Sequence, residues 1–301
     1  MGTIVQARCV FTMPFYFESC GVFNTTILFA LEVCVMEQLS PAEFSVVYNF
    51  FSLVVATMGA AFVFFMGARS NLAPQYRVSM LVSAVVVGVA GYHYFRIFQS
   101  WDAAFALNEA GTAYIATGQP FNDAYRYADW LLTVPLLMVE AVAVLSLSKE
   151  VRGKMLAKLS FAAALMIALG YPGEIAADNS TRMIWGTLST IPFCYILYVL
   201  WVEMSRATEN ESGEVKVLFR NMRLLILGTW GVYPIAFLFP VFGIASASAV
   251  VGLQVGYSIA DITAKAGYGL MIYAIARSKS QSEGYAVGHS DNDSPRLAAA
   301  S

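Results

Sequence analysis

A lysine lies inside a long apolar stretch near the end of the chain. Residues 250–276 are apolar and long enough to cross a bilayer, yet they contain Asp261 and, one helical turn later, Lys265. A lone ammonium group is costly inside a membrane, so such residues face a protein interior and mark ion paths, proton relays or covalent ligand sites. An apolar residue would pack there at lower cost, which makes a purely structural role a poor explanation for Lys265.

A second cluster lies in residues 125–140. Asp129, Thr133 and Glu140 share one face of the predicted helix, and the two carboxyl groups are separated by roughly 16 Å along its axis. If Asp129 and Asp261 turn toward Lys265, the ammonium has the anionic partners that a buried cation requires. Glu140 stands alone in apolar surroundings and is expected to be protonated at rest. This layout is that of a proton relay.

Other residues fit the same picture but have ordinary explanations as well. Arg126 lies one turn before Asp129, and His93 could hydrogen-bond the outer acceptor. A single buried glutamate can also serve as a structural partner, and a single histidine on an apolar face is often only a core residue. The prolines within the predicted helices can simply be tolerated kinks.

The sixth apolar segment carries an aromatic stripe. Trp230, Tyr233, Pro234 and Phe237 follow i, i+3, i+4, i+7 spacing, and Trp130 stands beside Asp129. Such a stripe is usually ordinary packing. Together with a lysine that could form a Schiff base, however, a slot between flat rings suits an elongated conjugated aldehyde.

Composition indicates an integral membrane protein. The 301 residues are 58% hydrophobic and 13% charged, which is far more apolar than a soluble domain of this length. This excludes a soluble enzyme, and the net charge of -2 gives no indication of nucleic-acid binding. The four cysteines lack metal-ligand spacing, so we expect no metal site, whereas a disulfide near the N-terminus stays open.

The hydropathy pattern predicts an all-α bundle of seven transmembrane helices. The expected spans are residues 44–68, 76–98, 122–147, 154–171, 182–201, a sixth beginning at 224 and a seventh ending at 276, the last two divided near Pro240 and Gly243. Most lysines and arginines fall on one side of this arrangement. The positive-inside rule therefore predicts an outside N-terminus and a cytoplasmic C-terminus.

Three regions follow from this pattern. We expect an N-terminal extension over residues 1–40, a membrane domain over 41–277 and a disordered cytoplasmic tail over 278–301. The extension is open to three interpretations: a targeting segment, an ordered cap, or a consequence of start-site choice, since Met36 begins a natural short N-terminus.

Three motifs carry a family resemblance. The run RYADWLLTVPLL with Glu140, the WGVYP of the sixth segment and the DITAK of the seventh resemble the microbial (type 1) rhodopsins, over about residues 43–277. The resemblance implies all-trans retinal bound as a protonated Schiff base on Lys265, with Asp129 as counterion and proton acceptor and Asp261 as second counterion. The triplet Asp129, Thr133, Glu140 resembles proteorhodopsin-like outward proton pumps, with Glu140 as donor. Release would pass Arg126, and His93 would interact with the acceptor.

The resemblance extends to the chromophore pocket and to a second pigment. The retinal pocket would be formed by Trp130, Leu137, Met166, Gly170, Ser189, Thr190, Trp230, Tyr233, Pro234 and Phe237. Leucine at 137 resembles the green-absorbing type. The segments GYHYFRIF and GYPGE are similar to the xanthorhodopsin-like branch, some members of which bind a carotenoid antenna against a glycine that Gly186 matches.

These features favour a light-driven outward proton pump in a lipid bilayer. The resemblance further implies a homo-oligomer, pentamer or trimer, in the plasma membrane of a bacterium or in a plasma or organelle membrane of a eukaryote. The alternative is a sensory photoreceptor that signals through a separate partner. A sodium or chloride pump would be expected to replace Asp129 or Glu140, and a transporter that uses Lys265 without light would show no absorption band with retinal.

Overall fold

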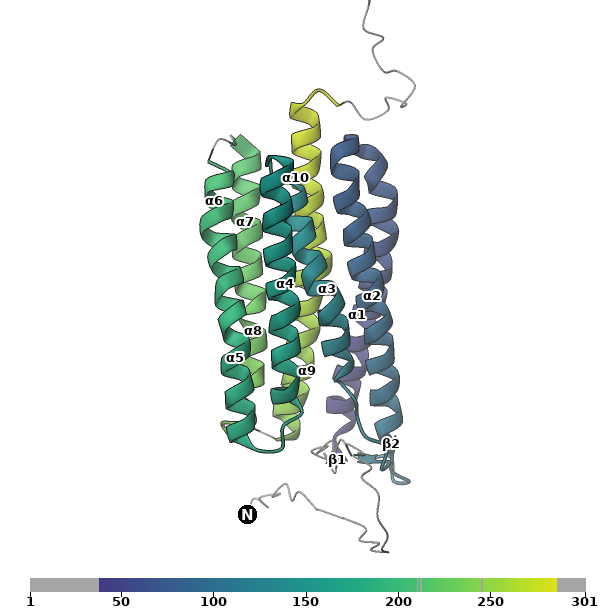
Figure 1. Cartoon of the computed structure of the whole chain (residues 1–301). Coiled ribbons are helices and arrows are strands. Elements are labelled where there is room, and N and C mark those ends of the chain that lie inside the picture. Colours follow the sequence, from purple (N-terminus) through teal and green to yellow (C-terminus); the bar gives the residue numbers. More distant parts are fainter. Residues whose placement is uncertain (1–37, 210, 212, 245, 286–301) are drawn as a thin grey trace, which may run out of the picture.

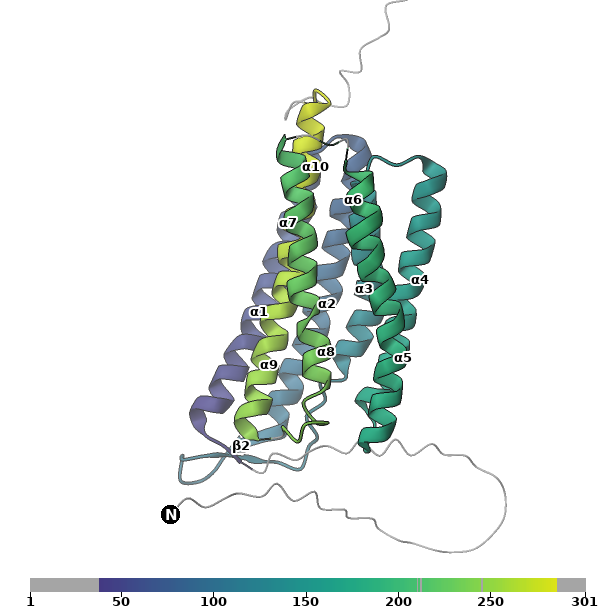
Figure 2. The same ribbon diagram turned by 90° about the vertical axis from the view of Figure 1, so that its left-hand side faces the viewer.

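The described residues form seven helical rods. These rods stand side by side in a single bundle (Figure 1 and Figure 2). The structure is a computed structural model that describes residues 38–209, 211, 213–244 and 246–285. The first four rods are α1 (Pro41–Ala68), α2 (Arg77–Ala104), α3 (Tyr125–Ala143) and α4 (Lys149–Glu174). The fifth comprises α5 (Asn179–Tyr198), the π-helical η3 (Val199–Glu203) and α6 (Met204–Ala207); the sixth comprises α7 (Gly213–Trp230) and α8 (Val232–Phe237). The seventh comprises α9 (Ala247–Asp261), the π-helical η4 (Ile262–Gly267) and α10 (Tyr268–Ser282).

By length and composition alone, four helical segments of the described chain are long and apolar enough to cross a membrane. They are Pro41–Asn71, Pro74–Ala104, Lys149–Glu174 and Asn179–Ala207. The remaining rods contain the buried charged residues of the third and seventh predicted spans or, in α7, several basic residues. Charged side chains therefore lower the mean hydropathy of the helices that contain them.

The first helix begins three residues earlier than the apolar run. The Ser40 hydroxyl accepts the Glu43 backbone N–H at 3.2 Å, the Glu43 carboxylate accepts the Ser40 N–H at 2.9 Å, and Pro41 opens the first turn. This capping box supplies partners for N–H groups that a helix leaves unpaired. Residues 38–40 thus belong to the folded body and not to the extension expected over 1–40; residues 1–37 lie outside the described residues.

A small sheet lies at the end of the bundle where α1 begins, which we call the strand end. Strands β2 (Phe105–Leu107) and β3 (Tyr114–Ala116) form an antiparallel hairpin after α2, and β1 (Gln38–Leu39) pairs with the outer side of β3. The Phe44 ring stacks on Tyr114 at 3.8 Å between centroids. The hairpin joins the start of the chain to the connection between the second and third rods, a link that hydropathy alone did not predict.

The seventh rod continues past the expected boundary at Arg277. Lys279 is buried and contacts Glu211 and Ser146, each at 2.6 Å, while the Ser280 hydroxyl accepts the Ala73 N–H at 3.0 Å. These contacts hold the helix in place to Ser282, so the beginning of the region expected to be disordered is helical. Residues 286–301 of that expected tail lie outside the described residues.

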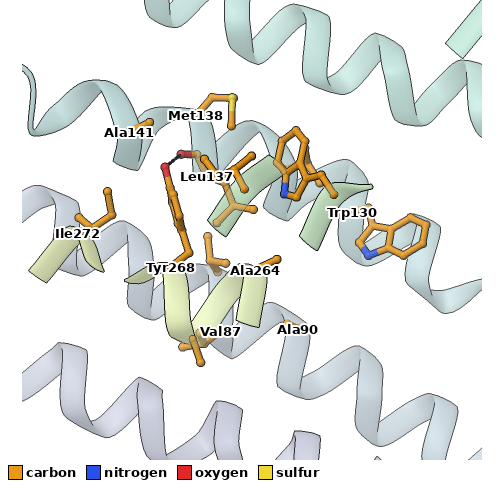
Figure 3. Packing of buried hydrophobic residues seen from close by; sticks show 14 of the residues in the cluster. Val87, Ala90, Trp130, Leu137, Met138, Ala141, Ala264, Tyr268 and Ile272 are labelled. Atoms are coloured by element: carbon orange, nitrogen blue, oxygen red, sulfur yellow. Dashed lines mark hydrogen bonds between the residues drawn. The ribbon is translucent and has the colours of Figure 1, made fainter. Parts of the chain in front are cut away.

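We call the end of the bundle at which α10 terminates the tail end. Buried apolar side chains fill the bundle between Lys265 and this tail end. Figure 3 shows Tyr268 pointing from α10 toward α3, where its hydroxyl donates to the Leu137 carbonyl at 3.1 Å, beside Met138 and Ala141. All four of these residues are 3% exposed or less. This dense packing separates the middle of the bundle from its tail end.

Helices α1 and α10 approach closely at a glycine. A methyl group on Gly269 would lie 2.5 Å from the Phe65 ring, and Phe65 is fully buried. We expect Gly269→Ala to destabilise the fold by about 1–3 kcal/mol through overpacking. The measurement is the temperature at which half of the detergent-solubilised protein aggregates. Gly228→Ala on α7, where nothing lies within 4 Å of the added methyl, is the control; an equal loss in both variants would contradict the packing argument.

Candidate functional site

The lysine lies in a π-helical turn at the middle of the seventh rod. Lys265 belongs to η4 and is 2% exposed. Its ammonium lies 3.0 Å from Asp129 Oδ2 on α3 and 2.8 Å from Asp261 Oδ1, one turn away on its own rod. Both carboxylates that the sequence singled out therefore meet the same nitrogen. The interaction compensates the desolvation of a cation that would otherwise be untenable there.

The two carboxylates have different surroundings. Asp261 accepts hydrogen bonds from the Tyr94 hydroxyl at 2.7 Å and from the Tyr233 hydroxyl at 2.5 Å. Asp129 is equally buried, but among the described residues neither of its oxygens accepts a hydrogen bond beyond the ion pair. Since hydrogen bonds to a carboxylate favour its charged form, Asp261 is the better-stabilised anion and Asp129 is the better proton acceptor.

A cavity opens beside the lysine. Its volume is about 310 Å³, within the range of small-molecule pockets, and its lining is mostly apolar. Trp130, Leu137, Met166, Gly170, Gly186, Ser189, Thr190, Trp230, Tyr233, Pro234 and Phe237 line it together with Lys265. All ten pocket residues proposed from the sequence, and Gly186, thus border one cavity that runs from η4 to helices α4 and α5.

A third buried carboxyl group lies on α3 toward the tail end. Glu140 is 1% exposed and, in the described part of the chain, forms no ion pair. Its Oε2 lies 2.6 Å from the hydroxyl of Ser83 on α2, and its Oε1 has no hydrogen-bond partner among the described residues. A carboxyl group without a counter-charge in such surroundings is stable only when it is neutral.

An arginine lies one turn from Asp129 toward the strand end. Arg126 donates to Asp123 Oδ2 at 3.1 Å and to Gln254 Oε1 at 2.5 Å, and its guanidinium carbon lies 4.7 Å from the Tyr257 ring centroid. Its carboxylate partner is therefore Asp123, and no ion pair with Asp129 is found in the described structure. Arg126 separates the lysine cluster from the loop that precedes α3.

Comparison with known proteins identifies the family. The family model for bacteriorhodopsin-like proteins matches residues 46–279, which is more than half of the chain. The chain is a microbial rhodopsin. It is 30% identical to the green-light absorbing proteorhodopsin of Gamma-proteobacterium EBAC31A08 over 75% of this chain and 84% of that protein. It is also 29% identical to archaerhodopsin-2 of Halobacterium sp. (strain aus-2), over 64% and 70% respectively.

Solved structures give the same assignment with higher identity. The crystal structure of xanthorhodopsin, described as a light-driven ion pump with dual chromophore, is 55% identical, with a TM-score of 0.80 over 83% of this chain and 99% of that chain. A thermophilic rhodopsin is 49% identical, with a TM-score of 0.79 over 82% and 99%. Membership of the family confirms the predicted seven-helix fold, makes this rhodopsin a multi-pass membrane protein and not an enzyme, and implies a retinal chromophore.

The residues of this rhodopsin fit that chromophore. Lys265 is the lysine at the cavity, and the aromatic rings of Trp130 and Tyr233 stand 5.0 Å apart between centroids along its wall. These features supply an amine for an aldehyde and flat apolar surfaces for a conjugated chain. No group of three or more histidine, cysteine or acidic side chains within the described residues could hold a metal ion.

The structure gives the contacts of two further residues predicted to belong to the site of this rhodopsin. His93 Nδ1 lies 3.0 Å from the Val89 carbonyl, and the hydrogen bonds of the described structure include none between His93 and Asp129. Thr133 donates to the backbone carbonyl of Asp129 at 2.9 Å, not to its carboxylate. Each of these two hydrogen bonds therefore goes to a backbone carbonyl and not to the Asp129 carboxylate.

Sequence reasoning did not find several partners of the site in this rhodopsin. Tyr94 and Ser83 on α2 contact Asp261 and Glu140, and Gln254 and Tyr257 on α9 contact Arg126. A signal for two of them was present in the sequence. Polar side chains at Ser83 and Tyr94 interrupt an apolar span, and buried polar groups in a membrane helix require partners.

Proposed function

We propose that this rhodopsin is a light-driven outward proton pump that carries all-trans retinal on Lys265. The observation that carries this proposal is the pair of buried carboxyl groups on α3: Asp129 lies against the lysine nitrogen, and Glu140 has no ion-pair partner among the described residues. One is arranged to receive a proton and the other to hold one. The similarity to a solved structure described as a light-driven ion pump supports ion pumping as the class of function.

Retinal bound through Lys265 would supply light absorption and an isomerisation that changes the proton affinity and the orientation of the lysine nitrogen. Asp129 receives the proton from that nitrogen, because it lies 3.0 Å away and lacks other hydrogen bonds in the described structure. Asp261 stays anionic since Tyr94 and Tyr233 donate to it. The asymmetry between the two carboxylates selects the acceptor.

Glu140 returns a proton to the nitrogen from the tail side. The Ser83 hydroxyl lies 2.6 Å from Glu140 Oε2 and 3.1 Å from the Ser79 carbonyl. A protonated Glu140 satisfies both contacts fully, because the carboxylic acid then donates to the Ser83 hydroxyl while that hydroxyl donates to the Ser79 carbonyl. This geometry supports Glu140 as a donor that is loaded before the cycle begins.

Glu140→Gln should slow recovery of the protonated pigment by about tenfold or more, because positioned proton transfer by a side chain contributes at least this much. The measurement is flash photolysis of the recovery phase. Addition of azide, a small diffusible proton carrier, should restore the rate in the variant. A recovery rate equal to that of the unmodified protein would remove Glu140 from the path.

The strand end would face outward and the tail end the cytoplasm, in agreement with the distribution of basic residues. A proton on Asp129 would then leave past Arg126, whose guanidinium is held by Asp123 and Gln254. His93 would act on the protonated acceptor: in the tautomer that donates Nδ1–H to the Val89 carbonyl, Nε2 can accept a hydrogen bond from a carboxylic acid. We further propose that this rhodopsin forms a homo-oligomer, a pentamer or trimer.

A carotenoid antenna at Gly186 would require a rearrangement. A methyl group added at Gly186 would lie only 2.5 Å from the Phe237 ring, so this ring already covers the surface that the glycine leaves open. A second pigment could use the glycine surface only after this ring moves. The neighbouring structure with a dual chromophore supports testing for such a pigment.

The function is tested by the light-driven pH change of an unbuffered suspension of cells that express the chain with added all-trans retinal. Acidification that a protonophore abolishes is the expected result. Alkalinisation that a protonophore enhances would instead indicate transport of another ion. A coloured protein that gives no pH change would favour the sensory photoreceptor.

A further inference from the structure

A buried arginine joins three helices near the strand end of the bundle. Arg182 on α5 is 8% exposed and donates to the backbone carbonyl of Glu174 at 2.7 Å, to its carboxylate at 3.3 Å, and to the carbonyl of Phe237 at 3.4 Å. Its guanidinium carbon also lies 5.1 Å from the Phe237 ring centroid. We call Arg182, Glu174 and Phe237 the Arg182 clamp.

The position of Arg182 follows from local structure. Glu174 and Phe237 are the last residues of α4 and α8, so their carbonyls belong to helix ends that attract a cation. Asp178 caps the start of helix α5: its side chain accepts the Thr181 N–H at 2.8 Å, and this bond lowers the pKa of the exposed Asp178 carboxyl. The cap fixes the first turn of α5, from which Arg182 reaches both helix ends.

The ring of Phe237 lies in a notch formed by two glycines. A methyl group on Gly186 would stand 2.5 Å from the ring, and one on Gly173 would stand 2.9 Å from it. Both distances are shorter than side chains tolerate, so the ring lies directly against the backbones of α4 and α5. The Arg182 guanidinium also contacts this ring. The attraction between a cation and an aromatic face favours the observed position of Phe237.

The same ring is part of the cavity wall. Phe237, Met183 and Thr187 border the cavity that contains Lys265, and the last two are exposed at the surface of α5. Phe237 is itself half-buried, so its ring lies at the boundary between the cavity and the outer surface of the bundle. A chromophore attached at Lys265 would place its far end in the region lined by α4 and α5.

We propose that Arg182 is a positioning residue that closes the side of the chromophore cavity by holding Phe237 in the notch of Gly173 and Gly186. This inference rests on the proposed function only for the identity of the ligand as retinal. The Arg182 clamp itself consists of contacts between protein residues. A purely structural arginine would stabilise the helix ends without controlling access to the cavity. Access is therefore the property to measure.

The first experiment is bleaching of the purified, retinal-loaded protein by hydroxylamine in the dark, which reports how readily a small nucleophile reaches the chromophore. Arg182→Gln should bleach about tenfold faster or more, since hydrogen bonds to a charged group are lost. Arg182→Lys should restore only part of the closure, because lysine lacks the planar fork. Arg96→Gln, which removes an arginine bonded to Tyr92 and Tyr125 outside the cavity lining, should leave the rate unchanged.

A double variant tests whether Arg182 acts through Phe237. Phe237→Ala should bleach as fast as Arg182→Gln or faster, and the double variant should bleach no faster than Phe237→Ala alone. Multiplicative effects, or an unchanged rate in Arg182→Gln, would overturn the proposal. Loss of thermal stability in Arg182→Gln with an unchanged bleaching rate would also overturn it, in favour of a structural arginine.

A second measurement works without retinal and so separates the clamp from the proposed function. Val134 lines the cavity and is 8% exposed. The probe is Val134→Cys in a protein whose four cysteines are replaced by serine. Adding Arg182→Gln should make this cysteine react with a small thiol reagent about tenfold faster, because the hydrogen bonds of the charged guanidinium are lost. Equal labelling rates would contradict the clamp even if the protein pumps protons, and faster labelling would support it even if no pigment forms.

Discussion

Asp129→Asn is expected to abolish light-driven proton transport and to leave a coloured protein. Asparagine at this position cannot take the proton from the lysine nitrogen, which lies 3.0 Å from the carboxylate. The absorption maximum should move to longer wavelength. A negative charge beside the protonated nitrogen stabilises the ground state, in which the positive charge lies at that nitrogen, so its removal lowers the excitation energy. Asp261 remains to compensate the cation, so the pigment should still assemble.

The measurements for Asp129→Asn are the absorption spectrum and the light-driven pH change of the same preparation. Asp178→Asn is a matched control, since Asp178 is an exposed cap residue at the start of α5 and asparagine caps helices as well. It should retain both colour and transport. Transport that persists in Asp129→Asn would refute the acceptor role.

Lys265→Ala should give a protein with no visible absorption band when retinal is added. It should also be less stable, because removing one partner of a buried ion pair leaves uncompensated charge and typically costs about 3–5 kcal/mol. The deletion leaves Asp129 and Asp261 together without their cation. Tyr94 and Tyr233 still donate to Asp261, so Asp129 is the group left without a partner.

The stability effect can be separated from the loss of pigment. Comparison of retinal-free proteins by thermal aggregation should show Lys265→Ala below the unmodified chain, and addition of Asp129→Asn should recover part of the difference. A visible band in Lys265→Ala that depends on retinal would show that the attachment site lies elsewhere. A double variant no more stable than Lys265→Ala would contradict the stated origin of the destabilisation.

The seven rods and the central charges were predictable from sequence because each depends on one segment at a time. Apolar runs of sufficient length define spans, and the i, i+4 spacing of Asp261 and Lys265 places both on one face of a helix. The aromatic stripe of the sixth rod and Trp130 likewise line the cavity in the structure. In these cases helical periodicity and the cost of buried charge were sufficient.

Contacts between rods were harder to predict. Whether Tyr94 or His93 of α2 meets the lysine cluster depends on how α2 is rotated in the bundle, and the structure turns Tyr94 inward to Asp261. Hydropathy gives no such rotation when a span is apolar on all sides. Arg182 illustrates the same limit, since its partners are carbonyls of two other helices that no sequence pattern marks.

Gly186 shows how a resemblance can be partly informative. The resemblance pointed to Gly186 as a contact for a carotenoid antenna, and in the structure this glycine lines the cavity beside Lys265. The structure adds that Phe237 occupies the surface which the missing side chain leaves free. This contact depends on how the sixth rod is placed relative to the fifth, which the sequence does not specify.

The most direct test of an outward proton pump at Lys265 uses purified protein in liposomes loaded with retinal, with the membrane potential dissipated by valinomycin and potassium. Illumination should acidify the compartment that faces the strand end, at the same rate in sulfate buffers free of sodium and chloride as in buffers that contain both. A light-driven pH change that requires sodium or chloride, or that has the opposite direction relative to the strand end, would contradict the account.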